Sequence, residues 1–136
     1  MSQFSNQIIK TFEARASITA YTCVAALATT TASVGPWNTV TLFPIGVAQN
    51  NASTGDAIEV CIGGTSKVGC QAAVTGGQVV QPGTVTANIT LGIGCIKNAA
   101  TFTVTTNWPT LGIALESGLT NSVIEVLVNP TNVYPA

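Results

Sequence analysis

The sequence predicts an all-β fold, a small β-barrel or β-sandwich, from two observations. Short apolar segments recur at short intervals with Gly, Pro or Asn between them, and no long stretch shows the helical period. The segment at residues 45–62 also returns without a gap at residues 111–128. Two copies are too few for a solenoid, which usually stacks at least three units. The repeat therefore indicates a duplicated strand-loop-strand unit inside one compact domain.

The two copies of the repeat share more than their apolar pattern. They read IGVAQNNASTGDAIEVCI and LGIALESGLTNSVIEVLV, and each passes from a short apolar run through polar and small residues into a strand. In the closing strand of the first copy, Ile58, Val60 and Ile62 share one face. The residues identical in both copies are Gly46/Gly112, Ala48/Ala114, Thr54/Thr120, Ile58/Ile124, Glu59/Glu125 and Val60/Val126.

Alternation of apolar and polar residues predicts further strands outside the repeat. It is clear from Thr11 to Tyr21, which indicates a half-buried strand with Glu13 and Arg15 placed to form an ion pair. An apolar, β-branched segment follows it. Shorter segments of the same type lie at residues 39–43, 85–91 and 101–105, separated by turns at Gly-Gly and Pro-Gly pairs.

The two ends of the chain differ from its middle. Residues 1–10 are rich in Gln, Ser and Asn, and the last residues hold prolines and a tyrosine. We therefore predict a single β domain at residues 11–130, with an extended N-terminal arm at residues 1–10 and a C-terminal tail at residues 131–136. Such ends are either frayed or become ordered against a partner.

The charge content excludes several classes of function. Asp, Glu, Lys and Arg make up 7% of the 136 residues, against roughly 25% in an average globular protein, and the formal net charge is −1. This provides no basic stripe for nucleic acid and no polybasic patch for a membrane. No segment approaches the roughly 18 consecutive apolar residues of a membrane span. The opening residues also lack a signal-peptide pattern. A net charge near zero favours association with other proteins.

Candidate catalytic groups are few, and we expect no enzyme activity and no cofactor. The chain has no histidine, so triads that depend on a histidine base are excluded. The Gly92-Ile93-Gly94 segment lacks the third glycine of a dinucleotide-binding loop. The repeat-related pair Glu59 and Glu125 has the chemistry of an acid and base. Both lie opposite the Ile/Val face of their strands, however, and are expected to point outward.

The four cysteines, Cys23, Cys61, Cys70 and Cys95, do not form a metal site. They lack the paired spacing of zinc ligands, and no histidine can complete a set. In a reducing cytosol they would be small buried apolar residues. The alternative is a disulfide between Cys61 and Cys70 that closes the segment CIGGTSKVGC in oxidising surroundings.

Trp37 and Trp108 lie in loop-like settings just before the two copies of the repeat. As exposed aromatics they are candidate interface anchors or sugar platforms. As buried residues they would close the ends of a barrel. We expect one of them in the core and the other at an interface, and the sequence does not distinguish which.

Several short motifs together resemble the head decoration, or capsid cement, proteins of tailed bacteriophages. They are TFEA in the first strand, the pattern [IL]-G-[VI]-A followed by [IV]-E-V in both repeats, a Gly-Gly turn and a late glycine-rich segment. The resemblance covers roughly residues 8–130. It implies a small β domain, commonly trimeric, on the outside of the shell where major capsid subunits meet.

From this resemblance we expect a structural virion protein that is made in the host cytoplasm and lies on the outer capsid surface. Its partners would be the major capsid protein and itself, as a homotrimer, and it would stabilise the head by bridging neighbouring capsid subunits. A fibre or adhesion module that binds a host surface or glycan is the alternative. The candidate contact residues are Phe4, Ile8, Ile9, Phe12, Trp37 and Trp108.

Overall fold

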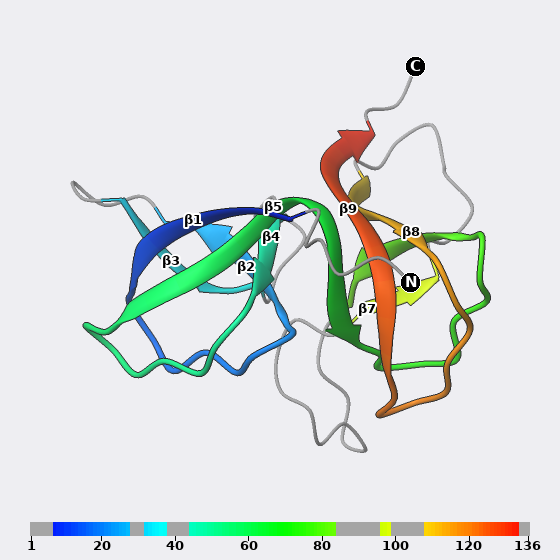
Figure 1. The fold of residues 1–136 in the computed structure, drawn as a ribbon, viewed down its shortest axis with the longest axis horizontal. Coiled ribbons are helices and arrows are strands. Elements are labelled where there is room, and N and C mark those ends of the chain that lie inside the picture. Colours follow the sequence, from blue (N-terminus) through cyan, green and yellow to red (C-terminus); the bar gives the residue numbers. More distant parts are fainter. Residues whose placement is uncertain (1–6, 28–31, 38–43, 84–95, 99–107, 134–136) are drawn as a thin grey trace.

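The fold was analysed in a computed structural model that describes residues 7–27, 32–37, 44–83, 96–98 and 108–133 (Figure 1). Every regular element in these ranges is a β-strand, which confirms the all-β prediction. Within the same ranges there is no helix long and apolar enough to cross a membrane. The strands are β1 (Gln7–Ala14), β2 (Cys23–Ala26), β3 (Ser33–Pro36), β4 (Pro44–Ala48), β5 (Ala57–Gly69), β6 (Val79–Pro82), β7 (Ile96–Asn98), β8 (Trp108–Ala114) and β9 (Val123–Val133).

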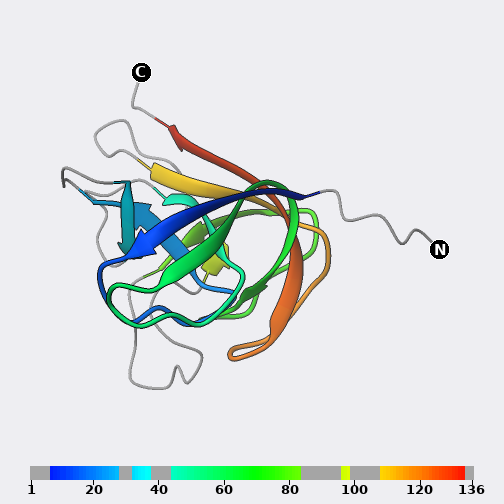
Figure 2. The ribbon, with the colours of Figure 1, turned by 60° about the vertical axis from the view of Figure 1, so that its left-hand side comes forward.

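Strands β1 to β5 close into a small barrel, which we call the first barrel. The strand order β1-β3-β2-β4-β5 returns to its start because β1 pairs with β3 on one side and with β5 on the other. Closure leaves no free strand edge in this part of the sheet. Figure 2 shows the blue-to-green strands of the barrel curving around a common interior. That interior is filled by Ala14, Ile18, Val24, Val34, Ala48, Ala52, Ile58 and Val60.

The remaining strands form a second half that begins on the same long strand. β5 pairs with β1 over Ala57–Gly64 and with β9 over Gly64–Gly69, so one strand serves both halves. The sheet continues from β9 through β8 and β6 to β7. A parallel bridge between Cys70 and Ile96 brings β7 back to the end of β5. Figure 1 shows the two halves side by side, with β5 passing from one to the other.

The second half repeats the first in strand register. Residues 44–62 correspond to residues 110–128, which is the spacing of the sequence repeat, and residues 9–26 correspond to residues 65–82 at a shorter spacing. The whole barrel is therefore duplicated, not only the segment visible in the sequence. Equivalent cross-strand pairs are Val47–Cys61 and Ile113–Leu127, Cys23–Val47 and Val79–Ile113, Phe12–Ile58 and Val68–Ile124, and Ala14–Val34 and Cys70–Ile96.

The loops repeat as well as the strands. Tyr21 and Gly77 occupy equivalent positions and have φ values of 65° and 86°. Gly55 and Asn121 are likewise equivalent, with φ values of 92° and 67°. These values lie in the left-handed region, where glycine and asparagine are common and a tyrosine is unusual. Such agreement in rare backbone conformations shows that the two halves have the same loop structure.

The boundaries of the terminal strands differ from the sequence prediction. Residues 7–10, assigned to the N-terminal arm, pair with β5 and are part of the barrel wall, and residues 131–133 of the expected tail belong to β9. The strand expected at residues 11–21 ends at Ala14. Glu13 and Arg15 form the expected ion pair, with Arg15 Nε 3.3 Å from Glu13 Oε1. Residues 1–6 and 134–136, and the strands expected at 39–43, 85–91 and 101–105, lie outside the described residues.

Candidate functional site

Glu59 and Glu125 occupy equivalent positions on β5 and β9, but only Glu59 points outward as expected, because the Oε2 atom of Glu125 is buried. Glu59 is exposed and pairs in register with Thr11, whereas Glu125 is half-buried and pairs with Lys67. In register, Glu125 therefore lies opposite a residue eight positions along β5 from Glu59. Among the described residues no cluster of His, Cys, Asp and Glu could hold a metal ion.

Cys61 and Cys70 are buried thiols and do not form the alternative disulfide. Both residues lie on or directly after the continuous strand β5, and an extended strand separates them by far more than the roughly 7 Å between Cα atoms that a disulfide spans. Cys61 and Cys70 are instead free thiols, and the side chains of Cys23, Cys61 and Cys70 are all fully buried in the apolar core. The Cys61 thiol donates a hydrogen bond to the Gly63 carbonyl at 3.1 Å. Cys95 lies outside the described residues.

Burial raises the pKa of the Cys70 thiol to about 11, and the nearby Glu116 carboxylate raises it further in the same direction. Burial also raises the pKa of Cys61, more than its backbone hydrogen bonds lower it. A thiol is a nucleophile only as its thiolate, so these cysteines are expected to be unreactive in the folded protein at neutral pH.

The stability of the fold is expected to fall as the pH rises from 9 to about 11. In the unfolded chain the Cys70 thiol ionises near its ordinary value of 9.0, whereas in the folded protein it keeps its proton until about 11. Ionisation therefore favours the unfolded state between these values, and the stabilisation is fully present only below pH 9. Urea unfolding at about pH 8 and about pH 10.5 measures the fall. Cys70→Ala, which places the residue found at the equivalent Ala14, should make the fall smaller. An unchanged fall would contradict the assignment.

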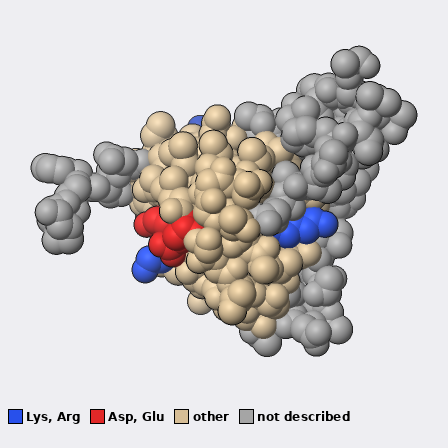
Figure 3. All heavy atoms as spheres, turned by 90° about the vertical axis from the view of Figure 1, so that its right-hand side faces the viewer, with Lys and Arg blue, Asp and Glu red and all other residues tan. Residues whose placement is uncertain are grey.

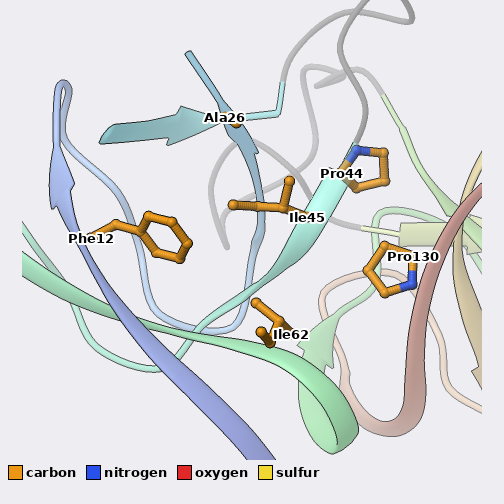
Figure 4. Close-up of a pocket in the computed structure, with 6 residues that line it drawn as sticks. All are labelled: Phe12, Ala26, Pro44, Ile45, Ile62 and Pro130. Carbon is orange, nitrogen blue, oxygen red and sulfur yellow. The ribbon is translucent and has the colours of Figure 1, made fainter. Parts of the chain in front are cut away.

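The first of two apolar surfaces is the mouth of the first barrel. It is a hollow of ≈ 470 Å³, and Figure 4 shows the side chains of Phe12, Ile45 and Ile62 converging on it from β1, β4 and β5. Lys10 stands at its rim, with Nζ 5.9 Å from the centre of the Phe12 ring. The described residues that line it are Phe12, Ala26, Pro44, Ile45, Ile62 and Pro130.

The second apolar surface is an outer row on the second half of the molecule. Val79 on β6 pairs in register with Ile113 on β8, which pairs with Leu127 on β9, so the three side chains share one face of the sheet. They are exposed to 40%, 41% and 41%. Leu115, just after β8, is also exposed. In Figure 3, which views this side of the molecule, most of the visible described surface is uncharged.

The candidate contact residues from the sequence lie in different settings. Ile8 and Ile9 on β1 are exposed, and Phe12 is half-buried in the mouth. Trp37 is only 1% exposed and belongs to the core between the two halves, so it is not an interface anchor in the folded chain. Phe4 and the side chain of Trp108 lie outside the described residues.

Comparison with known proteins identifies a structural neighbour and no sequence family. No family model and no curated protein matches the chain. The fold is similar to the crystal structure of the N base of the head fiber gp8.5 in bacteriophage phi29, with a TM-score of 0.64 and 16% sequence identity. The match covers 90% of this chain and 94% of that one, so it includes both halves of the duplicated fold.

Proposed function

We propose that this protein is a structural component of a bacteriophage virion that binds the outer surface of the head as a homotrimer. In this proposal it bridges neighbouring major capsid subunits and so stabilises the shell. The similarity to a phage head fiber base over nearly the whole of both chains carries the proposal. The motifs that resemble capsid cement proteins point to the same site of action by an independent route.

The composition and the surfaces agree with a protein that works by binding other proteins. Only 7% of the residues are charged, and the described surface carries a row of exposed Val, Ile and Leu side chains on adjacent strands. A contiguous patch of exposed apolar side chains often marks a site that binds another protein. Three linked copies that engage a lattice together would hold it far more tightly than one, because later contacts are intramolecular.

The nature of the structural neighbour supports a second candidate, that the chain is the base of a head fibre. Both functions attach the domain to the capsid, but they differ in what attachment does. A cement protein stabilises the shell to which it binds, because it binds only the assembled form. A fibre base anchors a projecting module, including one that binds a host surface or glycan, and need not stabilise the shell.

The test uses heads of the source phage that have been stripped of this protein. We expect the purified chain to bind them with saturable occupancy and to raise the temperature at which they release DNA. Occupancy without a change in release temperature would favour the fibre base, and no binding would overturn both proposals. Deletion of residues 2–6 tests the contribution of the N-terminal segment, since residues from Gln7 onward belong to β1. Unchanged occupancy would exclude Phe4 as a contact residue.

A further inference from the structure

The internal duplication shows what can cover the outer row of Val79, Ile113 and Leu127. Their equivalents in the first barrel are Cys23, Val47 and Cys61, which pair across β2, β4 and β5 in the same register. These three are 0% exposed, because their row lies in the core that the two halves share. The same sheet face is thus covered on one half of the molecule and bare on the other.

For the mouth the relation is reversed: it is open in the first barrel, and the equivalent surface of the second half is buried. Its lining residues Phe12, Ile45 and Ile62 correspond to Val68, Leu111 and Val128 of the second half. The second-half residues are at most 3% exposed and belong to the same core as the covered row. Ala26 and Pro44 of the mouth likewise correspond to the buried Pro82 and Thr110.

Inside one chain, therefore, the mouth of the second half packs against the covered row of the first barrel. Direct contacts of β4 with β8 and β9 join the two surfaces. A hydrogen bond from Gln49 Nε2 to Ser66 Oγ, 2.8 Å long, crosses the same junction. In the described part of the chain, one mouth and one row remain exposed.

We propose that the chain self-associates head to tail, with the outer row of one copy packed into the mouth of the first barrel of the next. The contact repeats between copies the junction already present between the halves, so the occupant of each bare surface is a second copy of this chain. The unused row carries Val, Ile and Leu where the covered row has Cys, Val and Cys, so its burial removes more apolar area from water. In the proposed contact, Leu115 of one copy and Lys10 of the next take the positions that Gln49 and Ser66 have at the junction within the chain. The aliphatic stem of the lysine can then pack on the leucine.

This proposal rests on the homotrimer of the proposed function and names the surfaces that form it. A contact between two different surfaces is heterologous, and it closes into a ring when the rotation between copies permits. Three copies would then place six similar barrels around one axis, with no row or mouth left bare.

The test uses two substitutions that place like charges on the two surfaces. Leu127→Glu alters the outer row, and Ala26→Glu places a charge at the exposed edge of the mouth without removing a core side chain. Leu119→Glu is the matched control, because Leu119 is a 71% exposed apolar residue outside both surfaces. Circular dichroism first confirms that each variant is folded, and sedimentation velocity then measures assembly.

We expect the unaltered chain and Leu119→Glu to form trimers. Each of the other two variants should remain monomeric even at a concentration at least a hundredfold higher than the one at which the unaltered chain forms trimers. An equimolar mixture of Leu127→Glu and Ala26→Glu should form dimers and nothing larger, because it can make one intact contact and no second. A mixture that stays monomeric, or a variant that assembles like the unaltered chain, would overturn the proposal. A monomeric unaltered chain would overturn it too. Trimers that fail to bind heads would instead count against the proposed function alone.

Discussion

Substitution of Gly46 or Gly112 by alanine is expected to destabilise the fold by about 3 kcal/mol or more, the upper end of what overpacking produces. A Cβ atom at Gly46 would lie 2.1 Å from the carbonyl oxygen of Cys61, and one at Gly112 would lie 1.8 Å from that of Leu127. Both obstacles are backbone atoms of a paired strand, which cannot rotate away as a side chain can. Urea unfolding of the purified variants measures the loss.

Gly63→Ala is the matched control, because its new Cβ would meet only the side chain of Ile8, with Cδ1 at 3.2 Å. That side chain can move, so we expect a change within about 1 kcal/mol. Because Gly46 and Gly112 occupy equivalent positions, their two substitutions should have similar effects. A value for either one close to that of Gly63→Ala would contradict the tight strand contact at that position.

The sequence reveals only one part of the duplication. In that part the spacing between the two copies is constant, and close contact with a neighbouring backbone or with the barrel interior restricts the residue type. Gly46 and Gly112 are identical because a side chain at either would collide with the neighbouring strand. Ile58 and Val60 match Ile124 and Val126 because all four fill a barrel interior. These constraints act on residue identity, so an ungapped comparison detects them.

In the first part of each barrel the two halves share mainly an apolar pattern and few residue identities, so the sequence does not reveal the repeat there. Phe12 corresponds to Val68, and Tyr21 to Gly77, at a spacing shorter than that of the visible repeat. The alternation from Thr11 to Tyr21 also overestimated the length of β1. It continues past Ala14 because Ile18 still points into the barrel interior, through an isolated bridge to Ala52 and not as part of a strand.

The candidate surfaces could be predicted only in part, because exposure depends on what lies outside a strand. Val47 and Ile113 occupy the same position in the repeat and have the same pattern of neighbours, yet one is fully buried and the other is 41% exposed. The difference arises from the packing of one half on the other, which periodicity within a strand does not encode. The sequence predicts Ile8 and Ile9 as contact residues because they are apolar residues in a polar segment, and both side chains are exposed.

Trp37→Ala is expected to lower the free energy of unfolding by about 3–5 kcal/mol, the usual loss for a buried tryptophan. Trp37 follows β3, its backbone N–H donates to the Cys23 carbonyl at 3.0 Å, and its side chain is among the largest fully buried ones. It lies in the core that includes residues of both halves, so the cavity would loosen their junction as well as the first barrel.

Measuring both the stability and the assembly of Trp37 variants distinguishes a core residue from an interface anchor. Trp37→Phe keeps most of the apolar volume and should cost roughly half as much as Trp37→Ala, since the loss scales with the cavity that remains. Both variants should unfold at lower urea concentration when studied as dilute monomers in the Leu127→Glu background, where assembly no longer contributes. If Trp37→Ala kept the stability of that monomer and abolished assembly in the unaltered background, Trp37 would be an interface anchor after all. Because Trp37 is 1% exposed and Leu127 is 41% exposed, we expect Trp37→Ala to lower mainly the stability and Leu127→Glu to lower mainly the assembly.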